Sequence, residues 1–140
     1  MPELRHYHIL ISHSWQYDEQ YRTVVSWLNL TRYFYWSNYS VSCDDPFDTR
    51  SDTGLENKLR EQISHCSCIL VLSGMYAYYS KWIRFEIECA KEFGKPIIAV
   101  MPWGQERTPQ FIQENADHIV GWNRDSVIDA IRYYAIPRTC

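Results

Sequence analysis

Short runs of apolar residues alternate along the chain with stretches in which apolar residues recur every three or four positions. The runs are typical of buried strands, and the periodic stretches are typical of helices that pack on them. The predicted strands are 6–12, 33–41, 66–74, 95–103 and 118–122. The predicted helices are 17–28, 53–63, 80–94, a short one at 109–115, and 127–135.

This alternation predicts a parallel sheet with helices on both faces. Five strands in a chain of 140 residues without repeats or a linker indicate a single domain, 1–140, with a flavodoxin-like α/β fold. The expected strand order is 2-1-3-4-5. In that order the winding reverses between the first and third strands, so a binding crevice is expected at their carboxyl ends.

The segment "SKWIRFEIECAKEFGKP" reads as a helix that Ser80 caps and Gly94 ends. At about 100° per residue, one side of this helix is polar and holds Arg84, Glu88, Lys91 and Glu92. The other side is apolar and holds Trp82, Ile83, Ile87, Cys89, Ala90 and Phe93. Glu86 falls on the apolar side, next to the expected crevice. It is either a structural carboxylate with a basic partner or a functional group.

Other residues reach the same crevice. Ser12 and His13 follow the first strand, although they can also simply close a turn and cap the next helix. Trp103 follows the fourth strand, where it either stacks on a ligand or covers the end of that strand. Trp82 lies one helical turn before Glu86, where it either walls a pocket or packs in the core.

Composition removes several classes of function. The hydrophobic and charged fractions, 46% and 22%, are those of a globular protein, and the net charge of −3 without a basic run argues against nucleic-acid binding. No apolar run approaches the ~20 residues of a membrane span. Five scattered cysteines without a signal peptide predict reduced thiols in the cytoplasm. Six Trp and eleven Tyr supply flat rings that suit a pocket for nucleotide bases.

Familiar cofactor chemistries do not match. The chain has neither a GxxxxGK[ST] loop nor a GxGxxG fingerprint. The first and third strands do not end in the acidic residues of a phosphoryl-accepting receiver domain, and the first loop is a poor flavin phosphate site. His6 and His8 share a strand face but have no third ligand at metal-like spacing. We therefore expect no metal and no bound cofactor.

"ILISHSW" at the first strand and "SKWIRFEIECA" after the third together resemble a TIR domain, and more narrowly the bacterial TIR-like proteins of Thoeris anti-phage defence. Trp82 and Glu86 meet the Trp-x-x-x-Glu spacing of that family. "NYSV" leading into "DDPF" adds a further match that ends at Phe47. The loop "CDDPFDTRSDTG" lacks the Pro-Gly of many animal and plant TIR domains, which leaves its role open.

The resemblance implies an enzyme that cleaves the nicotinamide–ribose bond of NAD+, its substrate. Glu86 is then the catalytic carboxylate, and Ser12, His13, Phe47, Trp82 and Trp103 are candidate substrate-binding residues. The released ADP-ribose is hydrolysed, cyclised or conjugated, and a cyclic or conjugated product activates a separate defence effector by diffusion. Self-association through TIR surfaces is also implied.

Two alternatives stay open. One is a TIR interaction module without turnover, although a pure scaffold gains nothing from a desolvated carboxylate. The other is an enzyme similar to the nucleoside deoxyribosyltransferases, which also place a glutamate at an anomeric carbon on a flavodoxin-like fold.

Overall fold

The computed structural model describes residues 6–12, 18–39, 52–72, 76–101 and 110–135, with the side chains at 18, 52–55 and 76–82 left out. Strands and helices alternate strictly along the chain. They are β1 His6–Ser12, α1 Asp18–Leu30, β2 Tyr35–Asn38, α2 Asp52–His65, β3 Cys68–Leu72, α3 Tyr76–Glu92, β4 Ile97–Val100, α4 Gln110–Asn115, β5 His118–Val120 and α5 Arg124–Tyr134.

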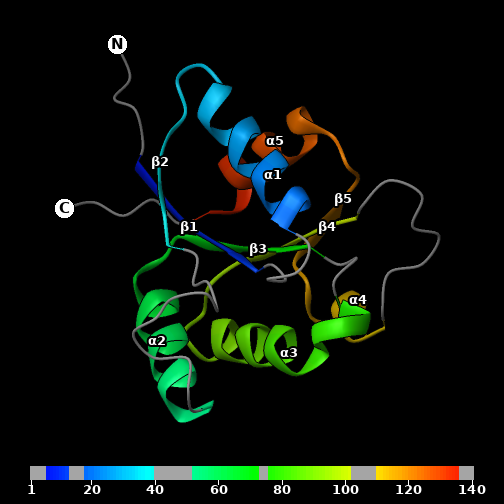
Figure 1. The fold of residues 1–140 in the computed structure, drawn as a ribbon. Coiled ribbons are helices and arrows are strands. Elements are labelled where there is room, and N and C mark those ends of the chain that lie inside the picture. The colour runs from blue at the N-terminus through cyan, green and yellow to red at the C-terminus, as the bar shows by residue number, and fades with distance from the viewer. Residues whose placement is uncertain (1–5, 13–17, 40–51, 73–75, 102–109, 136–140) are drawn as a thin grey trace.

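The five strands form one sheet in the order β2-β1-β3-β4-β5, and every neighbouring pair is parallel. Helices α1 and α5 lie together on one face, and α2 and α3 lie together on the other (Figure 1). The predicted flavodoxin-like architecture, with a winding reversal between β1 and β3, is therefore confirmed.

Burial explains which strands occupy the centre. All residues of β3 and β4 are buried, as their continuous apolar sequences require between two layers of helices. The edge strands differ, because both ends of β2 are exposed and β5 is buried only at Val120. The sheet therefore places the carboxyl ends of β1 and β3, the expected site, at its well-packed centre.

Helix α3 follows β3 and ends as its sequence predicts. Gly94 has a positive φ of 68°, and its N–H donates to the Lys91 carbonyl while the Lys95 N–H donates to the Ala90 carbonyl. These two bonds form the Schellman arrangement that satisfies the last carbonyls of a helix.

The predicted start of α3 is wrong, and α5 begins at Arg124, earlier than the predicted 127. Helix α3 begins at Tyr76, so Ser80 lies inside it and does not cap it. No glycine or proline stands between Tyr76 and Ser80, and the helix therefore continues back through the serine. Helix α2 begins at Asp52, one residue before the predicted start at 53. This difference is within the usual variation of helix boundaries.

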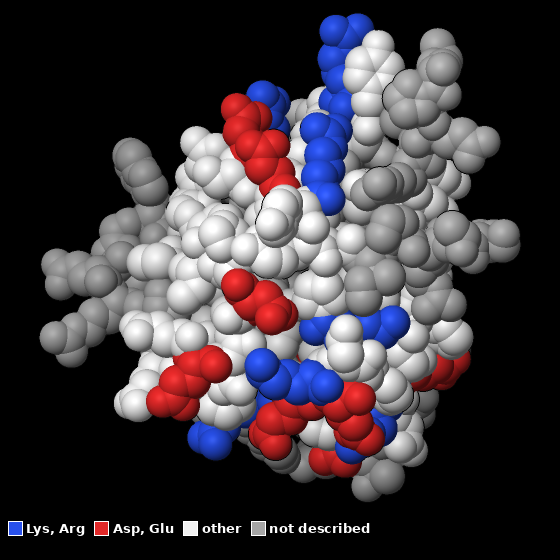
Figure 2. Space-filling view, turned by 180° about the vertical axis from the view of Figure 1, so that it is seen from behind, with Lys and Arg blue, Asp and Glu red and all other residues white. Residues whose placement is uncertain are grey.

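Charged side chains of both signs are interspersed on the face turned to the viewer in Figure 2. As far as the described residues show, this face has no broad basic area of the kind that nucleic-acid-binding proteins present. Within the same described part of the chain, no helix is both long enough and apolar enough to cross a membrane.

Candidate functional site

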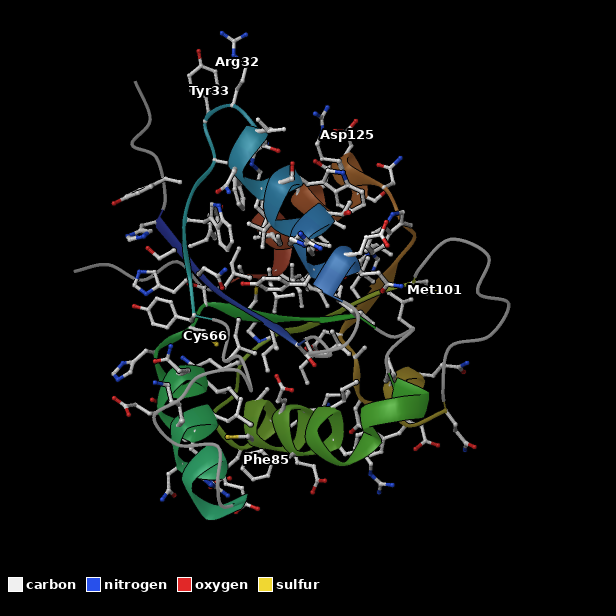
Figure 3. The ribbon with its side chains drawn as sticks, viewed as in Figure 1. Arg32, Tyr33, Cys66, Phe85, Met101 and Asp125 are labelled. Carbon is white, nitrogen blue, oxygen red and sulfur yellow. The ribbon has the colours of Figure 1, made fainter. Side chains whose placement is uncertain are left out.

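The phase of α3 places Glu86 inside the protein. Only 6% of Glu86 is exposed, and the side chains around it on the same face, Ile83, Ile87 and Ala90, are buried. Glu88 and Glu92 are exposed, as predicted. Phe85, the residue before Glu86, points away from the sheet (Figure 3). Among the predicted apolar residues whose side chains the structure describes, Phe93 is the exception. It is 40% exposed because it follows the last residue of the helix.

The carboxyl group of Glu86 meets the end of β1. The Ser12 hydroxyl donates a hydrogen bond to Glu86 Oε1 over 3.1 Å, although the two residues are 74 positions apart. Ser12 is the last residue of β1 and is 1% exposed, and its partner on β3 is Val71. Helix α3 follows β3 along the chain, and β3 is the neighbour of β1 in the sheet, so the helix lies within reach of the end of β1.

The carboxyl edge of the sheet is easily located in the side-chain view. Cys66 comes just before β3 and marks the amino edge, and Met101 comes just after β4 and marks the carboxyl edge. The two residues lie on opposite sides of the molecule (Figure 3). Ser12 and Glu86 thus meet at the edge where ligands bind in sheets of this topology.

Burial changes the acidity of this group. Loss of hydration raises the pKa of the Glu86 carboxyl to about 8, while the hydrogen bond from Ser12 acts in the opposite direction. In the protein alone, most molecules therefore carry a protonated Glu86 at neutral pH.

No ion pair among the described residues accounts for the buried glutamate. Among the described residues, no lysine, arginine or histidine bonds to Glu86. Arg60 of α2 pairs with the exposed Glu92 at 3.1 Å, and Arg84 of α3 lies over the Phe111 ring of α4 at 4.6 Å. The alternative of a structural carboxylate with a basic partner is therefore not supported by the part of the chain that the structure describes.

Four predicted site residues remain untested. His13, Phe47 and Trp103 lie outside the described residues, as does the side chain of Trp82. The backbone of Trp82 belongs to α3, one turn before Glu86. Their roles in substrate binding stay predictions, and so does the direct contact of Ser12 with substrate.

The sequence did not indicate that Ser12 is the partner of Glu86. Its position after an apolar strand marked it as a crevice residue, but the contact depends on how α3 packs under β1.

His6 and His8, the other polar pair on this face of β1, have ring centroids 4.4 Å apart. The described residues contain no group of three or more His, Cys, Asp or Glu side chains suited to a metal ion. Two surface hollows are lined by described residues, one beside β5 and α5 and the other between the end of α3 and Tyr134. Neither includes Ser12 or Glu86.

Comparison with known families decides the relationship. The model of the Thoeris protein ThsB, TIR-like domain, matches residues 10–107, a segment that contains both Ser12 and Glu86. The chain belongs to the ThsB TIR-like family. The resemblance noted in the sequence is therefore confirmed.

A solved structure extends the likeness of this ThsB-type chain to nearly its full length. It is that of a CMP N-glycosidase, BcmB, from Clostridium botulinum, with a TM-score of 0.60 and 16% identity. The match covers 91% of this chain and 98% of the other. At that identity the likeness is one of fold. No curated protein matches the sequence.

Proposed function

We propose that this protein is an N-glycosidase-type enzyme that cleaves the bond between nicotinamide and ribose in NAD+, with Glu86 as the catalytic residue. The observation that carries the proposal is a buried carboxyl group at the carboxyl end of β1, without a basic partner among the described residues. Membership of the ThsB TIR-like family supports a role in nucleotide processing. The fold shared with a CMP N-glycosidase is consistent with the same class of bond cleavage.

The reaction needs charge stabilisation more than proton transfer. When the C–N bond breaks, its electron pair leaves with the nicotinamide ring, which changes from a cation into a neutral molecule. The ribose is left as an oxocarbenium-like cation, as in glycoside hydrolysis. An ionised Glu86 opposes that positive charge in surroundings of low dielectric, where the interaction is stronger than in water.

The fate of the ribosyl cation defines the product. Capture by water gives ADP-ribose, capture by the adenine half gives a cyclic isomer, and capture by another small molecule gives a conjugate. We propose that a cyclic or conjugated product diffuses to a separate defence effector, as the ThsB-type relationship suggests. We further expect that the protein acts in the cytoplasm, self-associates through TIR surfaces and uses no cofactor besides its substrate NAD+.

A nucleotide N-glycosidase acting on a neutral base is the second candidate, because the structural neighbour is described as a CMP N-glycosidase. Purified protein incubated with NAD+ in one series and CMP in another, followed by mass spectrometry, separates the two. We expect nicotinamide and an ADP-ribose product from NAD+, and no cytosine from CMP. Cytosine release alone would favour the second candidate, and no release in either series would favour a TIR interaction module.

A further inference from the structure

The Glu86 carboxyl has an unusual set of neighbours for a buried acid. Its one hydrogen bond comes from the neutral hydroxyl of Ser12, and the surrounding side chains of α3 are apolar. A buried carboxylate normally has a positive partner or several donors, since the loss of hydration otherwise disfavours its charge. Among the described residues, neither kind of compensation is present for an ionised Glu86.

The described titratable groups of α3 and α2 do not stabilise an ionised Glu86. On α3 the titratable group that interacts with Glu86 is the Cys89 thiol, whose pKa is raised chiefly by burial. On α2, the helix packed against α3, Arg60 pairs with Glu92, one turn beyond Cys89. None of these side chains places a positive charge on the Glu86 carboxyl.

The strands above Glu86 are equally poor in charge. On this face of β1, the titratable residues are His6 and His8. They lie at the end of the strand opposite to Ser12. On β3 the titratable residue is Cys68, also at the amino end, where burial raises the pKa of its thiol. Within the part of the chain that the structure describes, no charge balances an ionised Glu86, and a cationic ligand would supply one.

We propose that a positively charged ring of the substrate supplies this missing charge, so that its binding and the loss of the Glu86 proton are one linked event. This inference rests on the proposed function and deepens it, because it identifies the feature of the substrate that the site selects. The released proton passes to the buffer, and the carboxylate that remains faces the cationic ring. The site thereby favours N-glycosides of cationic bases, such as NAD+, over NADH and CMP, whose bases are neutral.

Linkage gives this proposal a quantitative form. Because the free carboxyl has a pKa of about 8, the affinity of a ligand that binds only the ionised form rises up to about tenfold for each unit by which the pH increases toward that value. A ligand with a neutral ring gains nothing from ionisation, so its affinity is nearly independent of pH. The same carboxylate is then already formed when the ribose becomes positive.

The test measures protons released on binding. The probe is the carbocyclic analogue of NAD+, which keeps the cationic ring but has a methylene in place of the ribose ring oxygen and so resists cleavage. Calorimetric titration in two buffers of different ionisation enthalpy gives the number of protons released. For a free carboxyl of pKa about 8, we expect about one proton per ligand at pH 7 and nearly none at pH 9.5. NADH should bind more weakly and release none.

Matched variants assign the proton to Glu86. In Glu86→Gln the carbocyclic analogue should bind without proton release and with an affinity that hardly varies with pH. In Glu88→Gln, which removes an exposed carboxylate two positions along the same helix, proton release should equal that of wild type. Release that persists in Glu86→Gln would overturn the proposal.

The outcomes separate this inference from the proposed function. Cleavage of NAD+ together with analogue binding that releases no proton would overturn the linkage and leave the proposed function intact. Equal affinity and equal proton release with NADH would also overturn it. Failure of the analogue to bind, with no cleavage of NAD+, would overturn both.

Discussion

Two polar clusters lie on the same face of β1, one at each end of the strand. At the amino end, His6 forms a hydrogen bond of 2.6 Å with Ser37 and stacks on Tyr35 with ring centroids 4.0 Å apart. The backbone N–H of His8 donates to the Ser67 hydroxyl over 3.0 Å. At the carboxyl end, the partner that the described residues supply to Glu86 is the hydroxyl of Ser12.

The difference between the clusters lies in what the protein provides. At the amino end, described residues of β2 and of the segment before β3 supply partners for the His6 ring and for the backbone N–H of His8, and neither group needs a counter-charge. At the carboxyl end, an acid is held in apolar surroundings, and the described residues supply it with a single neutral donor. An acid that is buried without a counter-charge lowers the stability of the folded protein. Proteins keep such destabilising groups mainly at sites of ligand binding and catalysis.

The largest effect is expected from Glu86→Gln. The substitution keeps the size of the side chain and an oxygen that can accept the Ser12 hydrogen bond, but it removes the negative charge. We expect the rate of nicotinamide release from NAD+ to fall by about 10²–10³-fold, the usual effect of deleting a group that stabilises transition-state charge. Initial rates measured by chromatography of nicotinamide provide the check.

The controls for that experiment are on the same helix. Glu88→Gln and Glu92→Gln remove exposed carboxylates and should leave the rate near that of wild type. A loss in either variant as large as that in Glu86→Gln would mean that the burial of Glu86 is not what distinguishes it.

Much of this contrast follows from sequence alone. Continuous apolar runs predict the central strands and hence the order of the sheet, and the periodicity of α3 predicts that Glu86 is buried while Glu88 is exposed. Each of these predictions depends on a repeating pattern within a single element, and hydrophobic burial enforces such patterns.

Single contacts between elements were not predictable in this way. The bond between Ser12 and Glu86 depends on the depth at which α3 packs beneath β1, which no local pattern encodes. The start of α3 was misjudged for a related reason, because Ser80 suits both a cap and a helix interior. Local preference did not distinguish between them.

The second effect concerns stability and its dependence on pH. The unfolded carboxyl ionises near pH 4.5, whereas in the folded protein the pKa of Glu86 is about 8. The unfolded state therefore releases its proton first, and wild-type stability falls, relative to Glu86→Gln, as pH rises from about 4.5 through 8. We expect the stability of Glu86→Gln relative to wild type to increase by up to about 5 kcal/mol between pH 4 and pH 9.

Urea denaturation at a series of pH values measures this difference. Glu88→Gln, compared with wild type in the same way, should give a difference that hardly varies with pH. If the Glu86→Gln advantage were the same at pH 5 and pH 9, the carboxyl would not be titrating in the way its burial requires.

A smaller effect is expected from Ser12→Ala. Loss of the donor removes the one hydrogen bond that favours the ionised carboxyl, so the pKa of Glu86 should rise further and the pH profile of kcat/KM should move to higher pH. We expect about a tenfold loss of kcat/KM at pH 7, recovered in large part at high pH. Ser67→Ala deletes an equally buried hydroxyl near the other end of β1. It should lower stability without moving the profile.

The smallest effect is expected at the amino end, from Ser37→Ala. The hydroxyl of Ser37 is bonded to the His6 ring at a partly buried position on the edge strand β2, where water can replace a lost partner. We therefore expect the free energy of unfolding to fall by only about 0.5–1 kcal/mol, measured by urea denaturation. The rate of nicotinamide release and its pH profile should match those of wild type. If Ser37→Ala shifted the profile as Ser12→Ala does, the two ends of β1 would be coupled. The contrast between a cluster completed by the protein and one completed by its substrate would then be wrong.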